Sequence, residues 1–468
     1  MNAIFRNFQR VHLVGIGGTG MSGIAEVLLT LGFTVTGSDL RPTPVTERLE
    51  TLGATVFIGH QTENVQGANV VVVSSAVSAS NAEVGEAHRL KIPVIPRAEM
   101  LAELMRLKYG IAVAGAHGKT TTTSMVAAVL AAAGLDPTFV VGGRVKQAGA
   151  NARVGQGQYM VVEADESDGS LLRLSPVVTV VTTIDREHLD YYGSLEAVQQ
   201  TFVEFVNRVP FYGAGILALD DENVRAILPL VKRPVITYGS SPQADLVISG
   251  IELGGQGSEF DLTYRGEPLG RFRLPAPPGL HNVRNAAAAA AVGLYLNLPI
   301  ELIREGLGQF QGVARRFEVK GTPGGVALID DYGHHPAEVR ATLEAARLCG
   351  YRRLLVCFQP HRFSRTKLLW SDFTVAFDQA DRVILLEIYP AGEPPAEGVN
   401  SKLLAEAVAA AGHRHVDFCA TAAEAAEILA AEAEPGDAIL AIGAGSVGQI
   451  LDRVAEKLQG KDASHASH

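Results

Sequence analysis

Short apolar runs alternate along this chain with longer stretches of helical character. The runs fall in three successive blocks, at residues 11–14, 33–36, 70–73 and 92–95, then at 111–114, 159–162 and 177–184, and finally at 326–329, 354–358, 383–388 and 438–442. Short apolar runs separated by helices are typical of parallel sheets that are buried on both faces. The pattern therefore predicts an α/β protein of three domains, at residues 1–107, 108–317 and 318–468.

Two neighbouring segments depart from this alternation. Residues 245–274 are predicted to form extended, antiparallel segments, because their short runs are separated by glycine turns. After a break at residues 275–279, an alanine-rich helix is predicted with residues 286–291 at its centre. Such a run of alanine is expected to allow close packing rather than to carry chemistry.

Composition restricts the class of protein. The chain has 468 residues, 47% hydrophobic and 19% charged, as expected of a globular protein. Its formal net charge of −10 argues against a nucleic-acid partner, because a phosphate backbone requires a basic surface. Neither an apolar run of about 18 residues nor a signal peptide is found, so no membrane association is expected. The three cysteines lack metal or disulfide spacing, which favours a cytoplasmic protein. Only the polar tail, residues 461–468, is expected to be disordered.

The apolar run at residues 111–114 leads directly into Gly-Ala-His-Gly-Lys-Thr-Thr, residues 115–121. This order is typical of a phosphate-binding loop, in which backbone N–H groups and the start of the next helix bind phosphate oxygens. Lys119 would contact the β- and γ-phosphates, and Thr120 would contact Mg²⁺. The eight-residue form of the motif has glycine where Val113 stands, so a strand–turn–helix junction without a ligand is the alternative.

A second glycine motif follows the first apolar run of the chain. Gly15, Gly17 and Gly20 fit Gly-x-Gly-x-x-Gly, and Asp39 lies at the end of the next predicted strand. The motif is the fingerprint of dinucleotide binding, with a carboxylate for ribose hydroxyls. It predicts a diphosphate at the start of the following helix but does not identify the diphosphate, and a turn without a ligand is the alternative.

Candidate metal ligands end two further strands of the second block. Glu163 and His188 would converge on the phosphate region if their strands lie beside the phosphate loop, and carboxylate is a ligand that Mg²⁺ prefers. The alternative for His188 is a hydrogen-bonded loop histidine. Asp165, Glu166 and Asp168 form a dense acidic loop, and most of these side chains are expected to be solvated or structural.

Basic and imidazole side chains follow the strands of the third block. The cluster consists of His334, His335, His361, Arg362 and Arg365, with Asp330 and Asp331 nearby. Arginine matches the geometry of carboxylate and phosphate, so the cluster favours recognition of an anion, with a zinc site as the alternative. At the boundary before this block, Arg315 is placed either to reach a γ-phosphate or to pair with Glu318 on the surface.

Taken together, these clusters resemble the Mur ligases, and within that family the alanine-adding branch. The matching stretches are residues 15–21, 115–124, 163–168, 188, 279–282, 285–286, 315–318, 330–336, 359–366, 389–393 and 397–399. The strings Asp-Asp-Tyr-Gly-His-His-Pro and Gln-Pro-His-Arg-Phe-Ser-Arg-Thr indicate the branch. The resemblance implies a Rossmann-like N-terminal domain, a central P-loop-type ATPase domain and a Rossmann-like C-terminal domain. It also implies a cytoplasmic step of peptidoglycan synthesis that joins L-alanine to UDP-N-acetylmuramate through an acyl phosphate, with release of ADP and phosphate.

The resemblance also assigns roles to residues of this chain. It implies that the UDP-sugar binds at Gly15, Gly17, Gly18, Thr19, Gly20, Asp39, Ser74 and Ser75. ATP would bind at Gly115, Ala116, His117, Gly118, Lys119, Thr120, Thr121, His281, Asn282, Arg315 and Asp331. Mg²⁺, for which Mn²⁺ can substitute, would be held by Thr120, Glu163 and His188. L-Alanine would bind at Tyr332, His334, His361, Arg362 and Arg365, and catalysis would depend on Lys119, Glu163, His188 and Arg315.

Four positions depart from the pattern of the family, at Ala116, Thr183, Asp185 and Glu187. The carbamylated lysine of other Mur ligases is absent, because the sequence has no lysine between Lys146 and Lys232. The expected assembly is a monomer or a weak homodimer. Three alternatives stay open: a ligase of the same family that recycles murein tripeptide, an NAD-dependent dehydrogenase built on the first block, and a nucleotide-gated binding protein without catalysis.

Overall fold

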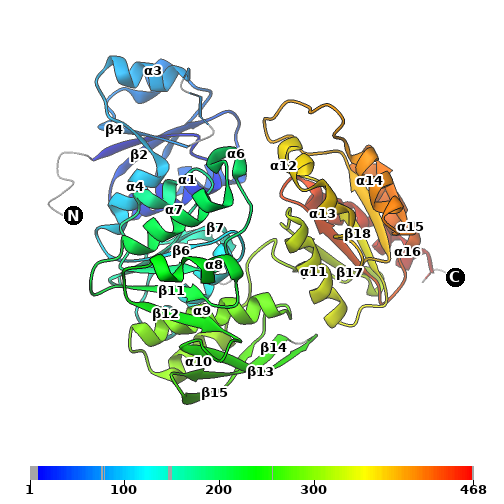
Figure 1. Cartoon of the computed structure of the whole chain (residues 1–468). Coiled ribbons are helices and arrows are strands. Elements are labelled where there is room, and N and C mark those ends of the chain that lie inside the picture. The colour runs from blue at the N-terminus through cyan, green and yellow to red at the C-terminus, as the bar shows by residue number, and fades with distance from the viewer. Residues whose placement is uncertain (1–8, 75–76, 79, 146–149, 256, 466–468) are drawn as a thin grey trace. The chain divides into compact units, whose positions relative to one another are not determined.

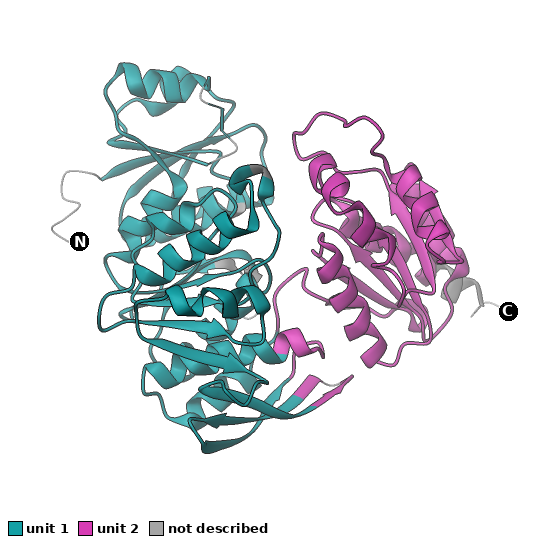
Figure 2. Cartoon of the chain, viewed as in Figure 1, with its two compact units in different colours: residues 1–251, 259–274, 283–311 teal, residues 252–258, 275–282, 312–468 magenta. Residues whose placement is uncertain are grey.

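The computed structural model describes residues 9–74, 77–78, 80–145, 150–255 and 257–465. The described strands form three separate sheets that are flanked by helices, which confirms the predicted α/β class (Figure 1). By its internal contacts the chain divides into two compact units (Figure 2). One unit contains residues 1–251, 259–274 and 283–311, and the other contains residues 252–258, 275–282 and 312–468. The predicted domain boundaries stay a prediction.

The N-terminal sheet is parallel throughout and has the order β3-β2-β1-β4-β5. Its strands are β1 (Arg10–Val14), β2 (Thr34–Asp39), β3 (Thr55–Ile58), β4 (Val70–Val73) and β5 (Val94–Pro96). The helical segments between them are α1 (Thr19–Thr30), α2 (Pro44–Thr51), η2 (Thr62–Val65), α3 (Ala82–Arg89) and α4 (Arg97–Met105). The sequence pattern did not predict β3, because the apolar run of this edge strand, at residues 56–58, is shorter than those of the predicted strands, and the strand is exposed or half-buried along its length.

The central sheet has ten strands in the order β15-β14-β13-β12-β11-β10-β6-β9-β7-β8. They are β6 (Tyr109–Ala114), β7 (Thr138–Val145), β8 (Ala150–Arg153), β9 (Tyr159–Glu163), β10 (Val178–Val181), β11 (Ala214–Ala218), β12 (Val235–Gly239), β13 (Leu246–Gly254), β14 (Gly257–Tyr264) and β15 (Glu267–Leu274). The helices are α5 (Lys119–Ala132), α6 (Leu189–Tyr192), α7 (Leu195–Asn207), α8 (Glu222–Ile227), α9 (Leu280–Tyr295) and α10 (Ile300–Gly308), with short 3₁₀ segments η3 (Ser170–Arg173) and η4 (Leu228–Leu230). Strand β6 lies between β9 and β10 and is parallel to both.

The C-terminal sheet has the order β16-β17-β21-β18-β19-β20, and only the edge strand β16 is antiparallel to its neighbour. Its strands are β16 (Glu318–Gly321), β17 (Ala327–Asp331), β18 (Leu354–Phe358), β19 (Arg382–Leu386), β20 (Val416–Cys419) and β21 (Ala438–Ile442). The helical segments are η5 (Pro323–Gly325), α11 (Pro336–Leu348), α12 (Phe363–Leu368), α13 (Trp370–Thr374), α14 (Ser401–Ala410), α15 (Ala422–Glu432), η6 (Val447–Gln449) and α16 (Ile450–His465). Helix α16 continues to His465, which differs from the predicted disordered tail, because an established helix extends easily into residues that tolerate it.

Small residues allow close packing in α9 and α10, and α10 lies against α5, the helix that begins at the phosphate loop. All six alanines at 286–291 of α9 are fully buried, which confirms that this run serves packing. In α10, a Cβ atom placed on Gly306 would lie 2.6 Å from Cα of Val129, in the backbone of α5. The backbones of α5 and α10 therefore approach each other at a distance that only glycine permits, and this contact fixes α5 in place.

The structure also bears on two expectations from composition, about membrane-spanning helices and about the cysteines. Among the described residues, no helix combines the length and the apolar character that crossing a lipid bilayer requires. Cys357 and Cys419 are buried, Cys349 is half-buried, and all three are free thiols.

We predict opposite effects on stability when alanine replaces two helical glycines. Alanine normally stabilises a helix by roughly 0.5–1 kcal/mol relative to glycine, and Gly85→Ala in α3 should do so because nothing lies within 4 Å of its new Cβ atom. Gly306→Ala should instead destabilise the protein by about 1–3 kcal/mol, because the backbone of α5 cannot move aside. Thermal unfolding of both variants measures the difference, and a raised midpoint for Gly306→Ala would contradict the close contact.

Candidate functional site

The phosphate loop lies where three adjacent parallel strands end. It follows β6, while Glu163 ends β9 on one side and residues 182–185 follow β10 on the other. Ligands in open parallel sheets bind at the carboxyl ends of strands, where the direction of the chain connections changes. The sequence-based expectation that Glu163 lies beside the phosphate loop is confirmed by this strand order.

Two glycines give the loop its shape. Gly115 has φ +136°, and a Cβ atom there would lie 2.2 Å from Thr182 Oγ1. Gly118 has φ 81° and stands directly before the first residue of α5. The strand end after β10 supports the loop, because Thr183 accepts hydrogen bonds from the N–H groups of Ala116, at 2.9 Å, and of His117, at 2.9 Å. Thr183, which departs from the family pattern, therefore fixes the loop.

Lys119 is held by oxygen atoms on several sides. Its Nζ donates to the carbonyl oxygen of Gly115 at 2.6 Å and to Glu166 Oε1 at 2.7 Å. Burial lowers the pKa of Lys119, but the carboxylates of Glu166 and Glu163 outweigh burial and raise it above its usual value, so the side chain is a cation. Within the acidic loop, whose side chains were expected to be mostly solvated or structural, Glu166 is buried, with 3% of its surface exposed. Burial and the nearby carboxylates of Asp165 and Glu187 raise the pKa of Glu166 to about 7, against the opposing effect of Lys119.

Thr120 and Glu163 lie together, as predicted for two ligands of one metal ion. Thr120 Oγ1 donates to Glu163 Oε2 at 2.9 Å, and the N–H of Gly142 donates to the same oxygen at 2.7 Å. A hydroxyl and a carboxylate oxygen are hard ligands of the kind that Mg²⁺ prefers, so these side chains fit this ion.

A second group of possible ligands joins His188 to two carboxylates. Atoms of Glu166, Glu187 and His188 that can bind a metal all lie within 4.8 Å of one another. His188 has φ 56°, an unusual conformation for a residue that is not glycine, and it stands directly before α6. Sequence reasoning selected His188 but did not include Glu166 and Glu187; their positions after β9 and β10 were the signal available for finding them.

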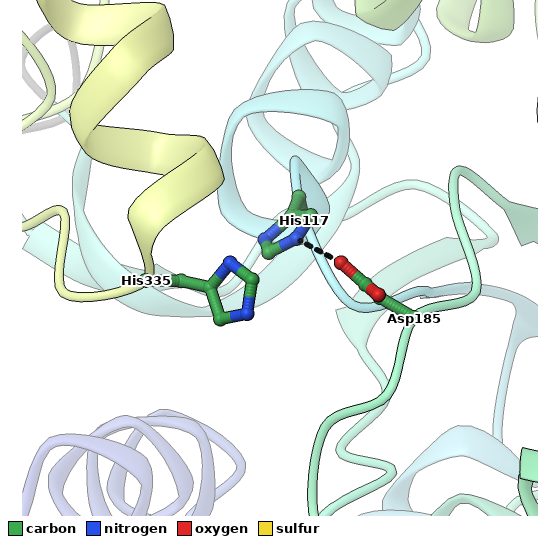
Figure 3. A group of neighbouring side chains, drawn as sticks. All are labelled: His117, Asp185 and His335. Atoms are coloured by element: carbon green, nitrogen blue, oxygen red, sulfur yellow. Dashed lines mark hydrogen bonds and ion pairs between the residues drawn. The ribbon is translucent and has the colours of Figure 1, made fainter. Parts of the chain in front are cut away.

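His117 and Asp185 approach each other from the phosphate loop and from the segment after β10. Nε2 of His117 lies 3.3 Å from Oδ2 of Asp185 (Figure 3). Asp185 is another position that departs from the family pattern, and here it orients the histidine side chain of the phosphate loop.

The first glycine loop is anchored to the end of β2. The N–H groups of Gly15 and Ile16 donate to the carbonyl oxygen of Ser38, at 2.8 and 3.0 Å, and the N–H of Gly17 donates to Asp39 Oδ2 at 2.9 Å. Asp39, predicted to bind ribose, thus holds the loop itself. Helix α1 begins at Thr19, and the first N–H groups of a helix have no acceptor within it, so they suit an anion.

Ser74 and Arg97 also border this loop. Ser74 lies beside Gly15, since a Cβ atom there would lie 3.8 Å from Ser74 Oγ, whereas Ser75 lies outside the described residues. Arg97, at the start of α4, was not selected from the sequence because it belongs to no motif. Its guanidinium covers Gly20, with 2.6 Å between Nη1 and a Cβ atom placed there, and Nη2 lies 3.4 Å from Asp165 Oδ2. A cation therefore lies between the start of α1 and the acidic loop after β9.

In the C-terminal unit, a row of rings connects the strand ends. Tyr332 and His334 have ring centroids 5.5 Å apart, His334 and His361 are 5.9 Å apart, and His361 stacks on Tyr389 at 5.6 Å. These residues follow β17, β18 and β19 of one sheet. Four of the residues predicted for amino-acid binding, Tyr332, His334, His361 and Arg365, are thus brought together, with Tyr389 as a fifth member that sequence reasoning did not select.

Cations surround His361 in this row. Arg365 Nη1 donates to His361 Nδ1 at 3.1 Å. Burial lowers the pKa of His361, and the positive charges of His334, Arg365 and Arg362 lower it further, to about 3. His361 is therefore neutral at physiological pH. Arg362 has φ 70° and stands directly before α12, and its guanidinium lies 3.9 Å from Glu393.

Arg315 and Asp331 lie beside the same row. Arg315 stacks on Tyr332 at 5.0 Å, donates to the carbonyl oxygen of Gly443 at 2.7 Å and pairs with Asp330 at 3.4 Å. The pairing of its side chain with Glu318 that the sequence left open is replaced by this pairing with Asp330. Asp331 is buried and accepts the N–H groups of Phe317 and Gly333, both at 2.7 Å, so it shapes the turn that carries Tyr332.

The start of α9 carries the remaining candidates. His281 is exposed, whereas Asn282 is buried and donates through Nδ2 to the carbonyl oxygen of Pro277 at 2.9 Å. Asn285 lies against the phosphate loop, since a Cβ atom on Gly118 would lie 2.6 Å from its Oδ1. Asn285 was part of the recognised pattern but was given no role, and this contact places it next to the loop.

Three family models match successive parts of this chain. Residues 10–109 match the family model of the Mur ligase family catalytic domain, residues 113–293 match the Mur ligase middle domain, and residues 315–445 match the Mur ligase glutamate ligase domain. The UDP-N-acetylmuramate–L-alanine ligase of Solibacter usitatus is 55% identical over 452 residues, with 96% of each chain covered. That of Koribacter versatilis is 55% identical over 464 residues, covering 98% of this chain and 99% of the relative.

A solved structure gives the same result. The UDP-N-acetylmuramate-alanine ligase of Thermotoga maritima superposes with a TM-score of 0.83 at 27% identity, and the match covers 97% of this chain and 99% of that chain. A three-domain α/β architecture is therefore established, and the chain belongs to the Mur ligase family.

Proposed function

We propose that this chain joins L-alanine to the carboxylate of UDP-N-acetylmuramate through an acyl phosphate, with conversion of ATP to ADP and phosphate. The observation that carries the proposal is the charged group at the phosphate loop, in which Lys119 and Thr120 lie beside Glu166 and Glu163. It is supported by relatives at 52–55% identity over almost the whole chain, which are all ligases of this kind. The recycling of a tripeptide is not favoured, because these relatives are all named UDP-N-acetylmuramate–L-alanine ligase and the two murein peptide ligase structures have lower TM-scores, 0.72 and 0.61, than the alanine ligase structure, 0.83.

The reaction requires activation because a carboxylate is a poor electrophile. An oxygen of the muramyl carboxylate attacks the γ-phosphorus, the bond from that phosphorus to ADP breaks, and an acyl phosphate forms. The neutral amine of L-alanine then attacks the acyl carbon, and phosphate leaves with its electron pair. The first step brings two anions together, and the ammonium group of Lys119 offsets their repulsion at the β- and γ-phosphates.

Thr120, Glu163 and His188 are proposed to hold Mg²⁺, with Mn²⁺ as its substitute. The ion would supply positive charge next to the phosphates and orient their oxygens. The residues of the chain place the ligands: β9 carries Glu163, the first turn of α5 carries Thr120, and the segment after β10 carries His188.

The two other substrate groups are assigned to the ends of the other sheets. The diphosphate of the UDP-sugar is proposed to bind at the start of α1, where Arg97 adds positive charge. L-Alanine is proposed to bind at the row of rings in the C-terminal unit, where Arg362 and Arg365 suit a carboxylate. Neutral His361 avoids repulsion of the incoming ammonium group. His281, Asn282, Arg315 and Asp331 stay proposed contacts of ATP.

The cellular setting follows from the reaction. Synthesis of a UDP-linked precursor with ATP suits a cytoplasmic enzyme, and the three free cysteines agree with a reducing compartment. We propose that the protein is a monomer or a weak homodimer.

A dehydrogenase would leave the phosphate loop and the C-terminal row without a role, and a binding protein without catalysis would not need Lys119 and Glu163 together.

Phosphate release with ATP and UDP-N-acetylmuramate is expected to depend on L-alanine. The measurement compares L-alanine, glycine, L-serine and the murein tripeptide at equal concentrations, with the amide product identified by mass spectrometry. Release that is independent of the amino acid, or that requires the tripeptide, would rule out the proposed reaction. Tight binding of NADH in a fluorescence titration would instead favour the dehydrogenase.

Replacement of Lys119 separates the two nucleotide sites. Lys119→Ala should lower kcat at least about 100-fold, because a preorganised cation at the transferred phosphate is lost. Calorimetry should show almost unchanged binding of UDP-N-acetylmuramate, since the first glycine loop belongs to another sheet. Loss of both turnover and binding of UDP-N-acetylmuramate would contradict the assignment of the two loops to separate substrates.

Removal of divalent metal should abolish phosphate release, and Mg²⁺ or Mn²⁺ should restore it. Glu163→Gln should raise the Mg²⁺ concentration needed for half the maximal rate by about 10-fold or more, because one negatively charged ligand is lost. The matched control is Asp168→Asn, which changes an exposed carboxylate of the same acidic loop. Equal effects of the two substitutions would show that Glu163 has no special role.

A further inference from the structure

A buried carboxylate lies beneath the first glycine loop and has no part in the reaction proposed above. Glu83, in the first turn of α3, has a fully buried side chain. Its Oε2 accepts hydrogen bonds from Ser38 Oγ at 2.6 Å and from His60 Nδ1 at 3.0 Å, and its Oε1 accepts from Asn64 Nδ2 at 2.6 Å. His12 Nε2 lies 3.6 Å from Oε1, within the range of an ion pair. Charged and polar groups thus converge on one carboxylate.

These groups come from every element around the carboxylate. His12 belongs to β1, Ser38 to the end of β2, His60 to the segment after β3, and Asn64 to η2. The ring of His12 is fixed on its other side, where Nδ1 bonds to Thr36 Oγ1 at 2.9 Å. Nε2 of His12 is buried and makes no hydrogen bond within the part of the chain that the structure describes, so the carboxylate is the group that compensates it.

Glu83 is ionised in this setting. Burial alone would raise its pKa, but the side chains of His12, Ser38 and Asn64 outweigh burial and lower the pKa to about 2. A buried charge is costly unless it is paired and hydrogen-bonded, so this carboxylate keeps its neighbours in fixed positions.

One residue connects this carboxylate to the loop. Ser38 donates through its hydroxyl to Glu83, while its carbonyl oxygen accepts the N–H groups of Gly15 and Ile16. Its neighbour Asp39 accepts the N–H of Gly17. The end of β2 therefore determines where the loop lies and, through the loop, where α1 begins.

We propose that Glu83 is a positioning residue for the UDP-sugar: through Ser38 it fixes the end of β2 that holds the first glycine loop. The inference rests on the proposed binding of the diphosphate at the start of α1. A displaced loop would weaken contacts to the diphosphate, whereas the phosphate loop for ATP lies at the end of another sheet. Loss of Glu83 is therefore expected to affect one substrate and spare the other.

Glu83→Gln is the sharpest test because it keeps the shape of the side chain. The carboxylate accepts through both oxygens, and the amide replaces one of them with an NH₂ group that faces donors. The KM for UDP-N-acetylmuramate should rise about 10-fold or more, while kcat and the KM for ATP should change less than about twofold. The control is Glu86→Gln on the same helix, which removes a charge that pairs with the exposed side chain of Arg89 and should leave all three constants unchanged.

Ser38→Ala keeps the test decisive if Glu83→Gln does not fold. It removes only the hydroxyl that connects Glu83 to β2 and leaves the bonds of Glu83 to His60 and Asn64 in place. The KM for UDP-N-acetylmuramate should rise about 3-fold or more, again with the KM for ATP unchanged.

Calorimetry on the unaltered protein separates the two ways in which the proposal can fail. If the unaltered protein does not bind UDP-N-acetylmuramate, the proposed substrate is wrong. If it binds and the substitutions lower thermal stability without changing the KM for the UDP-sugar, or raise both KM values equally, Glu83 is only structural and the inference is overturned.

Discussion

The balance of charge around Lys119 is the constraint on which the central site depends. One ammonium group lies among the carboxylates of Glu163, Glu166 and Glu187, so the site without a nucleotide is already anionic. A triphosphate adds several negative charges to this group, and unscreened charges a few ångströms apart repel strongly in a buried setting. Binding of ATP therefore requires further positive charge. Thr120, Glu163 and His188 are the residues proposed to hold a divalent cation that would supply it.

The backbone places these groups with little freedom. Gly115 and Gly118 adopt positive φ values at the two ends of the loop, and Gly306 lets α10 press against α5. Of the nine described non-glycine residues with positive φ values, three, His188, Arg315 and Arg362, were selected from the sequence as site residues. Such conformations persist only where the surrounding structure imposes them, and they concentrate at functional sites.

The sequence predicted the parts of this arrangement that depend on local pattern. Strands β18 and β21 have the predicted bounds, and the polar groups after β6, β9 and β17 lie where parallel strands place them. The same reasoning could not tell that Glu166 is buried, because an acidic run has the composition of a solvated loop. Whether such a side chain is buried depends on how the segment after β9 packs against Lys119, which the local sequence does not determine. Arg97 belongs to no short motif, and Asn285 and Tyr389 lie in recognised stretches that gave them no role, so only the packing of distant segments shows their positions.

Two buried carboxylates show how one kind of group takes different roles in neighbouring sheets. Glu166 has few donors besides Lys119, and its raised pKa shows that the protein stabilises its charge poorly. Glu166 Oε2 is buried and makes no hydrogen bond within the described residues, whereas Oε1 accepts from Lys119. Glu83 has donors on both oxygens and a pKa of about 2, so its charge is well stabilised and its neighbours are fixed. The number of donors, rather than burial itself, therefore determines how well the protein stabilises the charge of each buried carboxylate.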